Sequence, residues 1–335
     1  MSKLSYLHAF TLPLYVWISF HHVGLWSWTP VLVLFVALPL LELLIKPNAN
    51  NLNDQEKQKR NKDGFYRILL RLALPVVGVY VYLFTQSVSP ALDTITLLGR
   101  ISSMGLMLGV LGINIAHELG HKTNTTDPWI AKCLLFFTFY THFHLEHNYG
   151  HHRNVGLKKD PSTARKGEWL YAYWLRSIFM GWLSAWKIGM QRAKGHWWRN
   201  EVLFFSLVHL LLLAGIYFLF GIFVLLAYLG AAVFSWLLLE TVQYIEHYGL
   251  VRHKVSGLLY ENVDPKHSWN SNHLMGRTIL FELSRHSDHH AWPHKDYPVL
   301  DHHDESPQLP TGYPGMMLLS LVPPLFFWVI HPRMH

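Results

Sequence analysis

The sequence predicts an all-α integral membrane protein, and both composition and segment length support this fold class. Hydrophobic residues make up 51% of the 335 residues and charged residues only 15%, against roughly 25% charged in typical soluble domains. The chain also contains 14 Trp, 16 Tyr and 19 Phe. Several apolar segments approach the roughly 20 residues that a helix needs to cross a bilayer. We therefore expect one membrane-embedded domain that covers residues 1–335.

Six segments along the chain have the length and composition of transmembrane helices. They are 4–22, 29–45, 67–84, 95–114, 202–219 and 222–241. The first lacks a small-residue cleavage site and a second span follows closely, so we interpret it as a span and not as a signal peptide. A short break at Gly221 separates the last two segments and predicts a tight helical hairpin.

The basic residues predict which side of the membrane each connection occupies. The regions 46–71, 115–201 and 242–335 carry seven, twelve and seven of the 28 lysines and arginines. Because basic residues collect in cytoplasmic loops, this alternation places the three regions on the cytoplasmic side. The net charge of +7 is then explained by membrane topology, and it gives no reason to expect a nucleic-acid partner.

Four shorter segments are expected to lie outside the spans. Residues 129–141 are apolar but too short to cross the bilayer, and 170–190 are amphipathic, which predicts an interfacial or packed helix. Residues 313–330 contain two adjacent prolines and are expected to be re-entrant or surface-lying. The charged stretch 50–63 is expected to be a solvated loop.

Small residues recur on the fourth predicted span at Gly105, Gly109 and Gly112. In membrane helices such residues allow neighbouring backbones to approach closely. The same residues can also widen an apolar cavity between helices. The sequence favours close packing but leaves both interpretations open.

The cysteine content indicates how the chain handles electrons. Cys133 is the only cysteine, so the chain can form neither an internal disulfide nor a cysteine-ligated iron–sulfur or rubredoxin-type site. The sequence also contains no G-x-G-x-x-G nucleotide-binding motif. Any electrons used in a reaction are therefore expected to come from a separate partner.

The 24 histidines are concentrated in four clusters at the predicted cytoplasmic ends of the spans. The clusters are His117 and His121; His147, His151 and His152; His247; and His286, His289 and His290. Three of them contain an i, i+4 pair, which shares one face of a helix and can reach a single ion. Imidazole ligands suit Zn, Cu, Fe or Ni. Nine histidines exceed what one zinc uses but match two ions with four or five imidazoles each.

Two other functions compete with this interpretation. His117-Glu118-x-x-His121 has the spacing of a zinc protease, in which the glutamate is the general base. That mechanism needs one further ligand and leaves the other clustered histidines unexplained. A metal transporter would need polar residues along its spans, where His209 is the only candidate at the centre of a span.

Four acidic residues adjoin clustered histidines, namely Glu118, Glu146, Glu246 and Asp288. Metal-bound imidazoles usually donate their second ring N–H to a carboxylate or a carbonyl. We therefore expect these four side chains to accept hydrogen bonds from ligand histidines. Direct binding of one of them to both ions is left open.

Four blocks around the clustered histidines resemble the integral-membrane alkane monooxygenases. The blocks are H-E-L-G-H-K (117–122), E-H-N-Y-G-H-H-R-N-V-G (146–156), Q-Y-I-E-H-Y-G-L-V-R (243–252) and L-S-R-H-S-D-H-H-A (283–291). H-S-W-N-S-N-H (267–273) and L-P-T-G-Y-P-G-M (309–316) are also similar to that family. These enzymes are non-haem di-iron ω-hydroxylases related to xylene monooxygenase and, more distantly, to membrane fatty-acid desaturases and hydroxylases.

The resemblance implies a six-span fold with a cytoplasmic di-iron site in the bacterial inner membrane. It implies terminal hydroxylation of medium-chain n-alkanes with O2, with electrons from rubredoxin that a rubredoxin reductase reloads. The implied ligands are His117, His121, His147, His151, His152, His247, His286, His289 and His290. His273 is a candidate for a further ligand or for a group that holds one.

This sequence departs from the family pattern at a few positions. Gln243 stands where the family usually has Asn, Ser284 where it usually has Gln, and Trp292-Pro293-His294 alters the segment after the last cluster. None of these departures removes an implied ligand. They leave the substrate open between an alkane, the methyl group of an alkylbenzene and a fatty acyl chain, with desaturation as the alternative reaction on the last.

Overall fold

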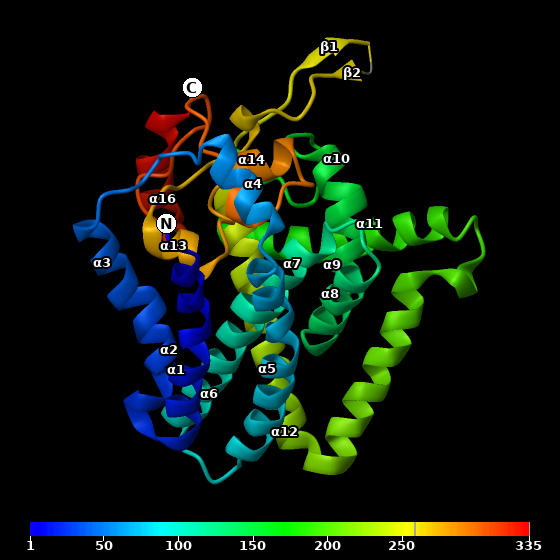
Figure 1. Cartoon of the computed structure of the whole chain (residues 1–335). Coiled ribbons are helices and arrows are strands. Elements are labelled where there is room, and N and C mark those ends of the chain that lie inside the picture. Colours follow the sequence, from blue (N-terminus) through cyan, green and yellow to red (C-terminus); the bar gives the residue numbers. More distant parts are fainter. Residues whose placement is uncertain (258, 335) are drawn as a thin grey trace.

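The computed structural model describes residues 1–257 and 259–334, and most of them are helical. Among these described residues, four helices are long and apolar enough to cross a membrane: Gly24–Leu44, Phe65–Ser87, Thr94–Gly120 and Glu201–His247. The all-helical membrane class predicted from composition is confirmed. Figure 1 shows the long helices side by side in its lower half, while the shorter, histidine-bearing helices gather above them.

Several of these apolar segments contain short turns of 3-10 or π-helix. The N-terminal segment consists of η1 (Lys3–Thr11) and α1 (Leu12–His21), and it is not among the four helices named above. The next segment consists of η2 (Gly24–Trp28), α2 (Thr29–Leu32), η3 (Val33–Ala37) and α3 (Leu38–Leu44). It is followed by α4 (Asp54–Lys62), α5 (Phe65–Ser87), α6 (Thr94–Met107), η4 (Leu108–Ile113) and α7 (Asn114–Gly120).

The longest helical element, α12 (Glu201–His247), contains a sharp break at Gly221. Gly221 has φ 84° and ψ 171°, a backbone conformation that favours glycine and interrupts the helix. The predicted segments 202–219 and 222–241 are the two arms on either side of this break. Figure 1 shows the first arm standing apart from the other helices.

Two helices extend beyond the predicted spans and carry clustered histidines with them. The predicted span 95–114 continues without interruption through α7 to Gly120, and the second arm of α12 continues to His247. His117 and His247 are therefore fixed to the rigid ends of long helices. This continuity links the positions of these histidines to the packing of the apolar bundle.

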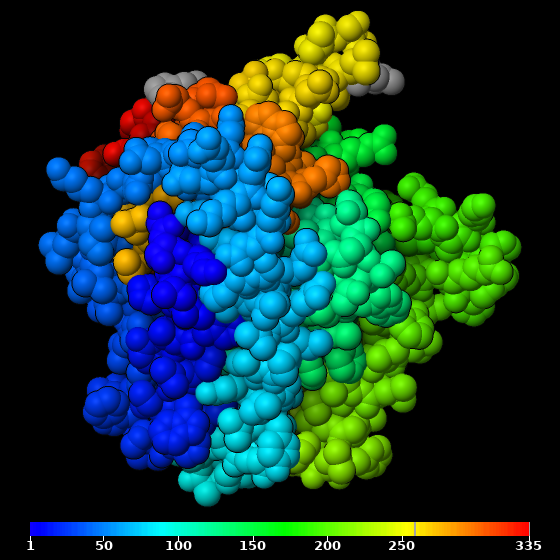
Figure 2. Space-filling model, viewed as in Figure 1, coloured from blue at the N-terminus to red at the C-terminus, as the bar shows by residue number. Residues whose placement is uncertain are grey.

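The remaining helices connect and cover the histidine-bearing end. They are α8 (Thr126–Phe137), α9 (His142–Leu145), η5 (Glu146–His151), α10 (His152–Asn154), α11 (Leu170–Arg192), η6 (Trp197–Arg199), η7 (Pro265–His267), α13 (Leu274–Ile279), α14 (His286–Ala291), η8 (Tyr297–Val299), α15 (Tyr313–Ser320), α16 (Pro323–Ile330) and η9 (His331–Arg333). The described strands, β1 (Lys254–Ser256) and β2 (Leu259–Tyr260), form a hairpin that projects from this end in Figure 2.

The charged stretch 50–63 was expected to be a loop, but residues 54–62 form helix α4. The Asn53 side chain accepts a hydrogen bond from the Glu56 N–H at 2.9 Å, and the Glu56 carboxylate accepts one from the Asn53 N–H at 3.2 Å. This reciprocal pair is a capping box, which stabilises a helix start. Lys57 also pairs with Asp301 at 2.7 Å, so α4 is fastened to the C-terminal region.

The glycine stripe serves both of the purposes that the sequence left open. A Cβ atom on Gly105 would lie 2.9 Å from the carbonyl oxygen of Ala231 on α12, so Gly105 is needed for close helix packing. Gly109 instead lines an apolar cavity, where an added Cβ would lie 3.3 Å from Leu238 Cδ1. Close packing at Gly105 and cavity lining at Gly109 therefore occur on the same continuous helix.

Candidate metal centre

The nine clustered histidines come together at one end of the helical bundle as two adjacent groups. We call them the five-histidine group and the four-histidine group. The five-histidine group contains His117, His121, His147, His152 and His289. The four-histidine group contains His151, His247, His286 and His290. Within each group, one nitrogen from every ring lies within 4.8 Å of the others, which is close enough to hold a metal ion.

The geometry of η5 (Glu146–His151) determines which group each histidine of the second sequence cluster joins. That cluster contains His147, His151 and His152. The segment η5 is a π-helix, in which residues five positions apart share a face. His147 and His152 consequently meet, with their Nε2 atoms 2.9 Å apart, while His151 turns to the other group. The prediction that His147 and His151 reach one ion together was therefore wrong, because it assumed α-helical spacing.

The other two i, i+4 pairs behave as the α-helical spacing predicts. His117 and His121 belong to the same group, and so do His286 and His290. His289, three positions after His286, belongs to the five-histidine group. The short helix α14 thus supplies ligand candidates to both groups, which keeps the groups next to each other.

Distances between ring nitrogens fit ligands around a shared ion. The Nε2 atom of His247 lies 3.2 Å from that of His151 and 3.0 Å from that of His286. An imidazole nitrogen lies about 2.1 Å from a bound zinc, so two such ligands at a right angle are about 3.0 Å apart. Tetrahedral ligands at the same bond length would be about 3.4 Å apart. Both observed separations fall within the range that two imidazole ligands of one ion would span.

Unpaired ring nitrogens provide an independent test of whether these residues fit a metal. Buried nitrogens without a hydrogen-bond partner include Nε2 of His117, His121, His289 and His290, and Nδ1 of His147, His152, His286 and His290. An unpaired buried polar atom costs roughly 1–3 kcal/mol, so such a concentration needs an explanation. Bound metal ions would satisfy the Nε2 atoms of His117, His121 and His289 and one ring nitrogen of His290. The rings of His147, His152 and His286 already present their Nε2 atoms to neighbouring grouped histidines.

The electrostatic environment keeps the histidines in the form that binds metal. Burial, together with the neighbouring histidines, lowers the pKa of His121, His152 and His289 well below the ordinary value. A neutral imidazole has a free lone pair, whereas a protonated ring cannot coordinate an ion. The site is therefore prepared for cations without prior deprotonation at neutral pH.

Asp160 supplies a carboxylate that contacts the second ring nitrogen of a grouped histidine, His151. Its Oδ2 lies 2.9 Å from His151 Nδ1 and also accepts a hydrogen bond from the Thr163 hydroxyl at 2.6 Å. Asp160 was not predicted from the sequence, because it lies nine residues beyond His151 in an irregular loop. A carboxylate in this position orients the ring and makes its other nitrogen a better ligand.

Three of the four acids that adjoin histidines in sequence have other partners. Glu118 accepts hydrogen bonds from Lys122 at 2.6 Å and from the Tyr297 N–H at 3.1 Å. Glu146 accepts one from Ser184 at 3.3 Å. Asp288 contacts Lys295 at 2.8 Å and His303, which belongs to neither histidine group, at 2.7 Å. These three acids therefore do not make the predicted hydrogen bonds to grouped histidines. Adjacent residues on a helix point in different directions, so being next to a histidine in the sequence does not place a carboxylate beside its ring.

Glu246 and His273 complete the set of candidate residues. Glu246 accepts a hydrogen bond from the Tyr313 hydroxyl at 2.9 Å, and its other oxygen lies 3.2 Å from His286 Nε2. It therefore lies beside the four-histidine group, although it contacts His286 and not its sequence neighbour. His273 contacts the Ser271 hydroxyl at 3.0 Å and belongs to neither group.

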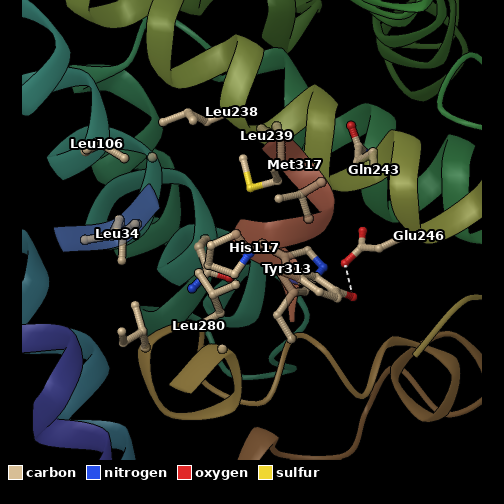
Figure 3. Close-up of a pocket in the computed structure, with 18 of the residues that line it drawn as sticks. Leu34, Leu106, His117, Leu238, Leu239, Gln243, Glu246, Leu280, Tyr313 and Met317 are labelled. Atoms are coloured by element: carbon tan, nitrogen blue, oxygen red, sulfur yellow. Dashed lines mark hydrogen bonds between the residues drawn. The ribbon is translucent and has the colours of Figure 1, made fainter. Parts of the chain in front are cut away.

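An apolar cavity leads from the membrane-embedded helices to both histidine groups. It is lined by residues of η3, α6, η4, α12 and α15, and it reaches His117 and His147 of one group and His286 of the other. Leu106, Leu238 and Leu239 lie at one end in Figure 3, and His117 and Tyr313 lie toward the other. An apolar chain in this cavity would have its end beside the grouped histidines.

The fold and the site together define a class of protein: a helical membrane protein with paired histidine groups beside an apolar cavity. The Fatty acid desaturase family matches residues 94–320, which include all nine grouped histidines. At the level of relatives, alkane 1-monooxygenase 2 of Pseudomonas aeruginosa is 36% identical over 96% of this chain and 88% of its own length. The alkane 1-monooxygenase of Ectopseudomonas oleovorans is 38% identical over 92% of this chain and 79% of its own length.

The chain therefore belongs to the alkane 1-monooxygenase family, and it is an integral membrane protein. The xylene/toluene monooxygenase hydroxylase component of Pseudomonas putida is also similar, at 25% identity over 93% of this chain and 84% of its own length. The family predicted from the four sequence blocks is confirmed. This membership also disfavours the zinc-protease interpretation of His117-Glu118-x-x-His121.

Proposed function

We propose that this protein uses O2 to hydroxylate medium-chain n-alkanes at a terminal carbon, giving 1-alcohols. The observation that carries the proposal is the apolar cavity that ends at His117, His147 and His286. An alkane offers no polar group to hold, so shape and apolar contact must place its chain end. The relatives named alkane 1-monooxygenase support this substrate class.

We propose that the five- and four-histidine groups each hold one non-haem iron ion. Two bound irons would supply the activation of O2 that oxidation of an unactivated C–H bond requires. The chain's own residues position the imidazoles, exclude water with the leucine-rich cavity walls, and hold the chain end near both groups. Glu246, beside His286, is the carboxylate best placed to join the imidazoles as a further ligand.

We propose that the protein has six spans and that both termini and the histidine groups are cytoplasmic. The segment of η1 and α1 would be the first span, and the two arms of α12 would be the fifth and sixth. The basic regions 46–71, 115–201 and 242–335 support this orientation. In a bacterial cell this topology corresponds to the inner membrane, with residues 1–335 acting as a single domain.

We propose rubredoxin, reloaded by a rubredoxin reductase, as the electron donor. The hydroxylation of one alkane by one O2 consumes two electrons, and the single cysteine of this chain cannot build an iron–sulfur site. The donor must therefore be a separate protein that reaches the cytoplasmic face.

The proposed function is tested by metal analysis of detergent-purified protein combined with product analysis. The expected result is about two irons per chain and rubredoxin-dependent conversion of octane to 1-octanol. Xylenes and fatty acids are supplied in parallel reactions. Zinc in place of iron, with no O2 uptake, would contradict the proposal, and alcohols formed only from xylenes would reassign the substrate.

We expect Gly109→Leu to lower kcat/KM for octane by about tenfold or more, the range that one misplaced group in an apolar pocket produces. The new side chain would meet Leu238 and occupy the cavity, because a Cβ alone would lie 3.3 Å from Leu238 Cδ1. Steady-state kinetics on octane measure the effect, and iron content should not change. Gly215→Leu is the matched control, since a Cβ on Gly215 meets nothing within 4 Å. Equal activity of the two variants would contradict the role assigned to the cavity.

A further inference from the structure

A second cavity, of about 430 Å³, lies between α11 and the two arms of α12. Its lining includes Leu175, Phe179, Trp182, Ser206, His209 and Trp236. Leu175 and Phe179 are 78% and 60% exposed, so this cavity opens onto the outer surface of the helices. Figure 1 shows how the first arm of α12, joined to α11, stands away from the rest of the bundle at this place. Because these helices are apolar, the molecules that reach the cavity come from the bilayer.

Two histidines that belong to neither metal-binding group face this cavity, namely His142 and His209. The Nε2 atom of His209 is buried and has no hydrogen-bond partner among the described residues. Its ring packs between Phe136 and Phe139, with ring centres 5.7 and 5.3 Å away. An ionisable side chain within a membrane span is costly and usually marks a functional site.

The chemistry of these rings indicates what kind of ligand they accept. Burial lowers the pKa of His142 to about 3, so this ring is neutral at physiological pH. A neutral imidazole has one N–H donor and one acceptor nitrogen. The described lining contains no lysine or arginine that would attract a carboxylate or a phosphate. A hydroxyl group, which both donates and accepts, is the complementary partner.

Stacked aromatic rings connect the lining of this cavity with the lining of the cavity that reaches the metal centre. Tyr140 lines the second cavity, and Phe143 lines the first. Their rings are stacked, with centres 6.1 Å apart and an interplanar angle of 22°. Phe143 in turn stacks on His147, at 4.8 Å. A molecule released from the metal centre is therefore close to the second cavity.

We propose that the second cavity is a binding site for a primary alkanol, with the hydroxyl at His209 and His142 and the alkyl chain along α11. The inference rests on the proposed function, because the alkanol is the product class of that reaction. The site would receive the alcohol on its way to the bilayer. An alkane would gain nothing from the two imidazoles, so the site distinguishes product from substrate.

The proposal is tested by photolabelling the iron-loaded protein in phosphatidylcholine nanodiscs. One probe is 1-decanol with a diazirine on its chain, and the other is decane with the same group. We expect the alkanol probe to label peptides that contain Phe179 or His209, with competition by unlabelled 1-decanol. His209→Phe should reduce this labelling about fivefold, the effect of one lost hydrogen bond. His209→Gln, which keeps a polar group, should retain most of it.

His8→Phe is the matched control, because His8 is an exposed histidine on η1, outside both cavities. Iron content reports whether each variant is folded. Equal labelling by the two probes would overturn the proposal, and so would labelling that 1-decanol does not displace or that His209→Phe does not change. The proposed function is judged separately, from 1-octanol production, because photolabelling requires no turnover.

Discussion

Replacement of His247 by alanine is expected to remove about one of two bound irons and to abolish alkane hydroxylation. His247 Nε2 lies between those of His151 and His286, at 3.2 and 3.0 Å, so it is central to the four-histidine group. Loss of a residue that only supports a ligand typically costs 10–100-fold in metal affinity or activity. Loss of the ligand itself should reduce activity by more than about 100-fold on the same scale.

Iron content and rubredoxin-dependent 1-octanol formation measure this prediction in parallel. His273→Ala is the matched control, because His273 lies near in sequence to the site but contacts Ser271 and belongs to neither group. It should keep both irons and most of the activity. If His247→Ala retained two irons and normal turnover, the assignment of the four-histidine group would be wrong. Loss of iron from His273→Ala would make that residue a ligand.

The membership of the histidine site was predictable from the sequence because the ligand candidates occur in short, dense clusters. Each cluster lies within one or two helical turns, so local geometry brings its members together without long-range information. The division into groups of five and four was less predictable. It depends on η5 being a π-helix, which moves His151 away from His147, and local sequence spacing does not reveal that bulge.

Contacts between distant segments were the least predictable part of the site. Asp160 reaches His151 only because the loop after α10 folds back, and Glu246 contacts His286, which comes 40 positions later. By contrast, helix α4 could have been predicted. Asn53 and Glu56 have the spacing of a capping box, although the high charge of the stretch is also typical of a solvated loop.

Glu118 illustrates how the surrounding structure changes the role of a motif. In a zinc protease, the glutamate of His-Glu-x-x-His activates water. Here its carboxylate is held by Lys122 at 2.6 Å and by the N–H of Tyr297 at 3.1 Å. The bond from Tyr297 ties the end of α7 to the C-terminal region. We therefore propose that Glu118 fastens the end of the helix that carries His117, which is a positioning role, and does not act as a general base.

Asp160→Ala is expected to weaken iron binding in the four-histidine group by about 10–100-fold. The carboxylate holds His151 Nδ1 at 2.9 Å, and the Thr163 hydroxyl and the Ser162 N–H hold the carboxylate in turn, at 2.6 and 3.2 Å. Without it, the ring of His151 loses both its orientation and the negative charge that strengthens its Nε2 as a ligand. Competition with an iron chelator measures the affinity, while the five-histidine group should retain its iron.

Asp160→Asn separates orientation from charge, because the amide oxygen can still accept the Nδ1–H hydrogen bond of His151. It should lose less affinity than Asp160→Ala. Asp304→Ala is the control for removal of an aspartate, since that side chain is fully exposed. Unchanged chelator competition in Asp160→Ala would show that Asp160 serves only the fold of its loop. Equal losses in Asp160→Asn and Asp160→Ala would assign the effect to the negative charge, because only that feature is missing from both variants.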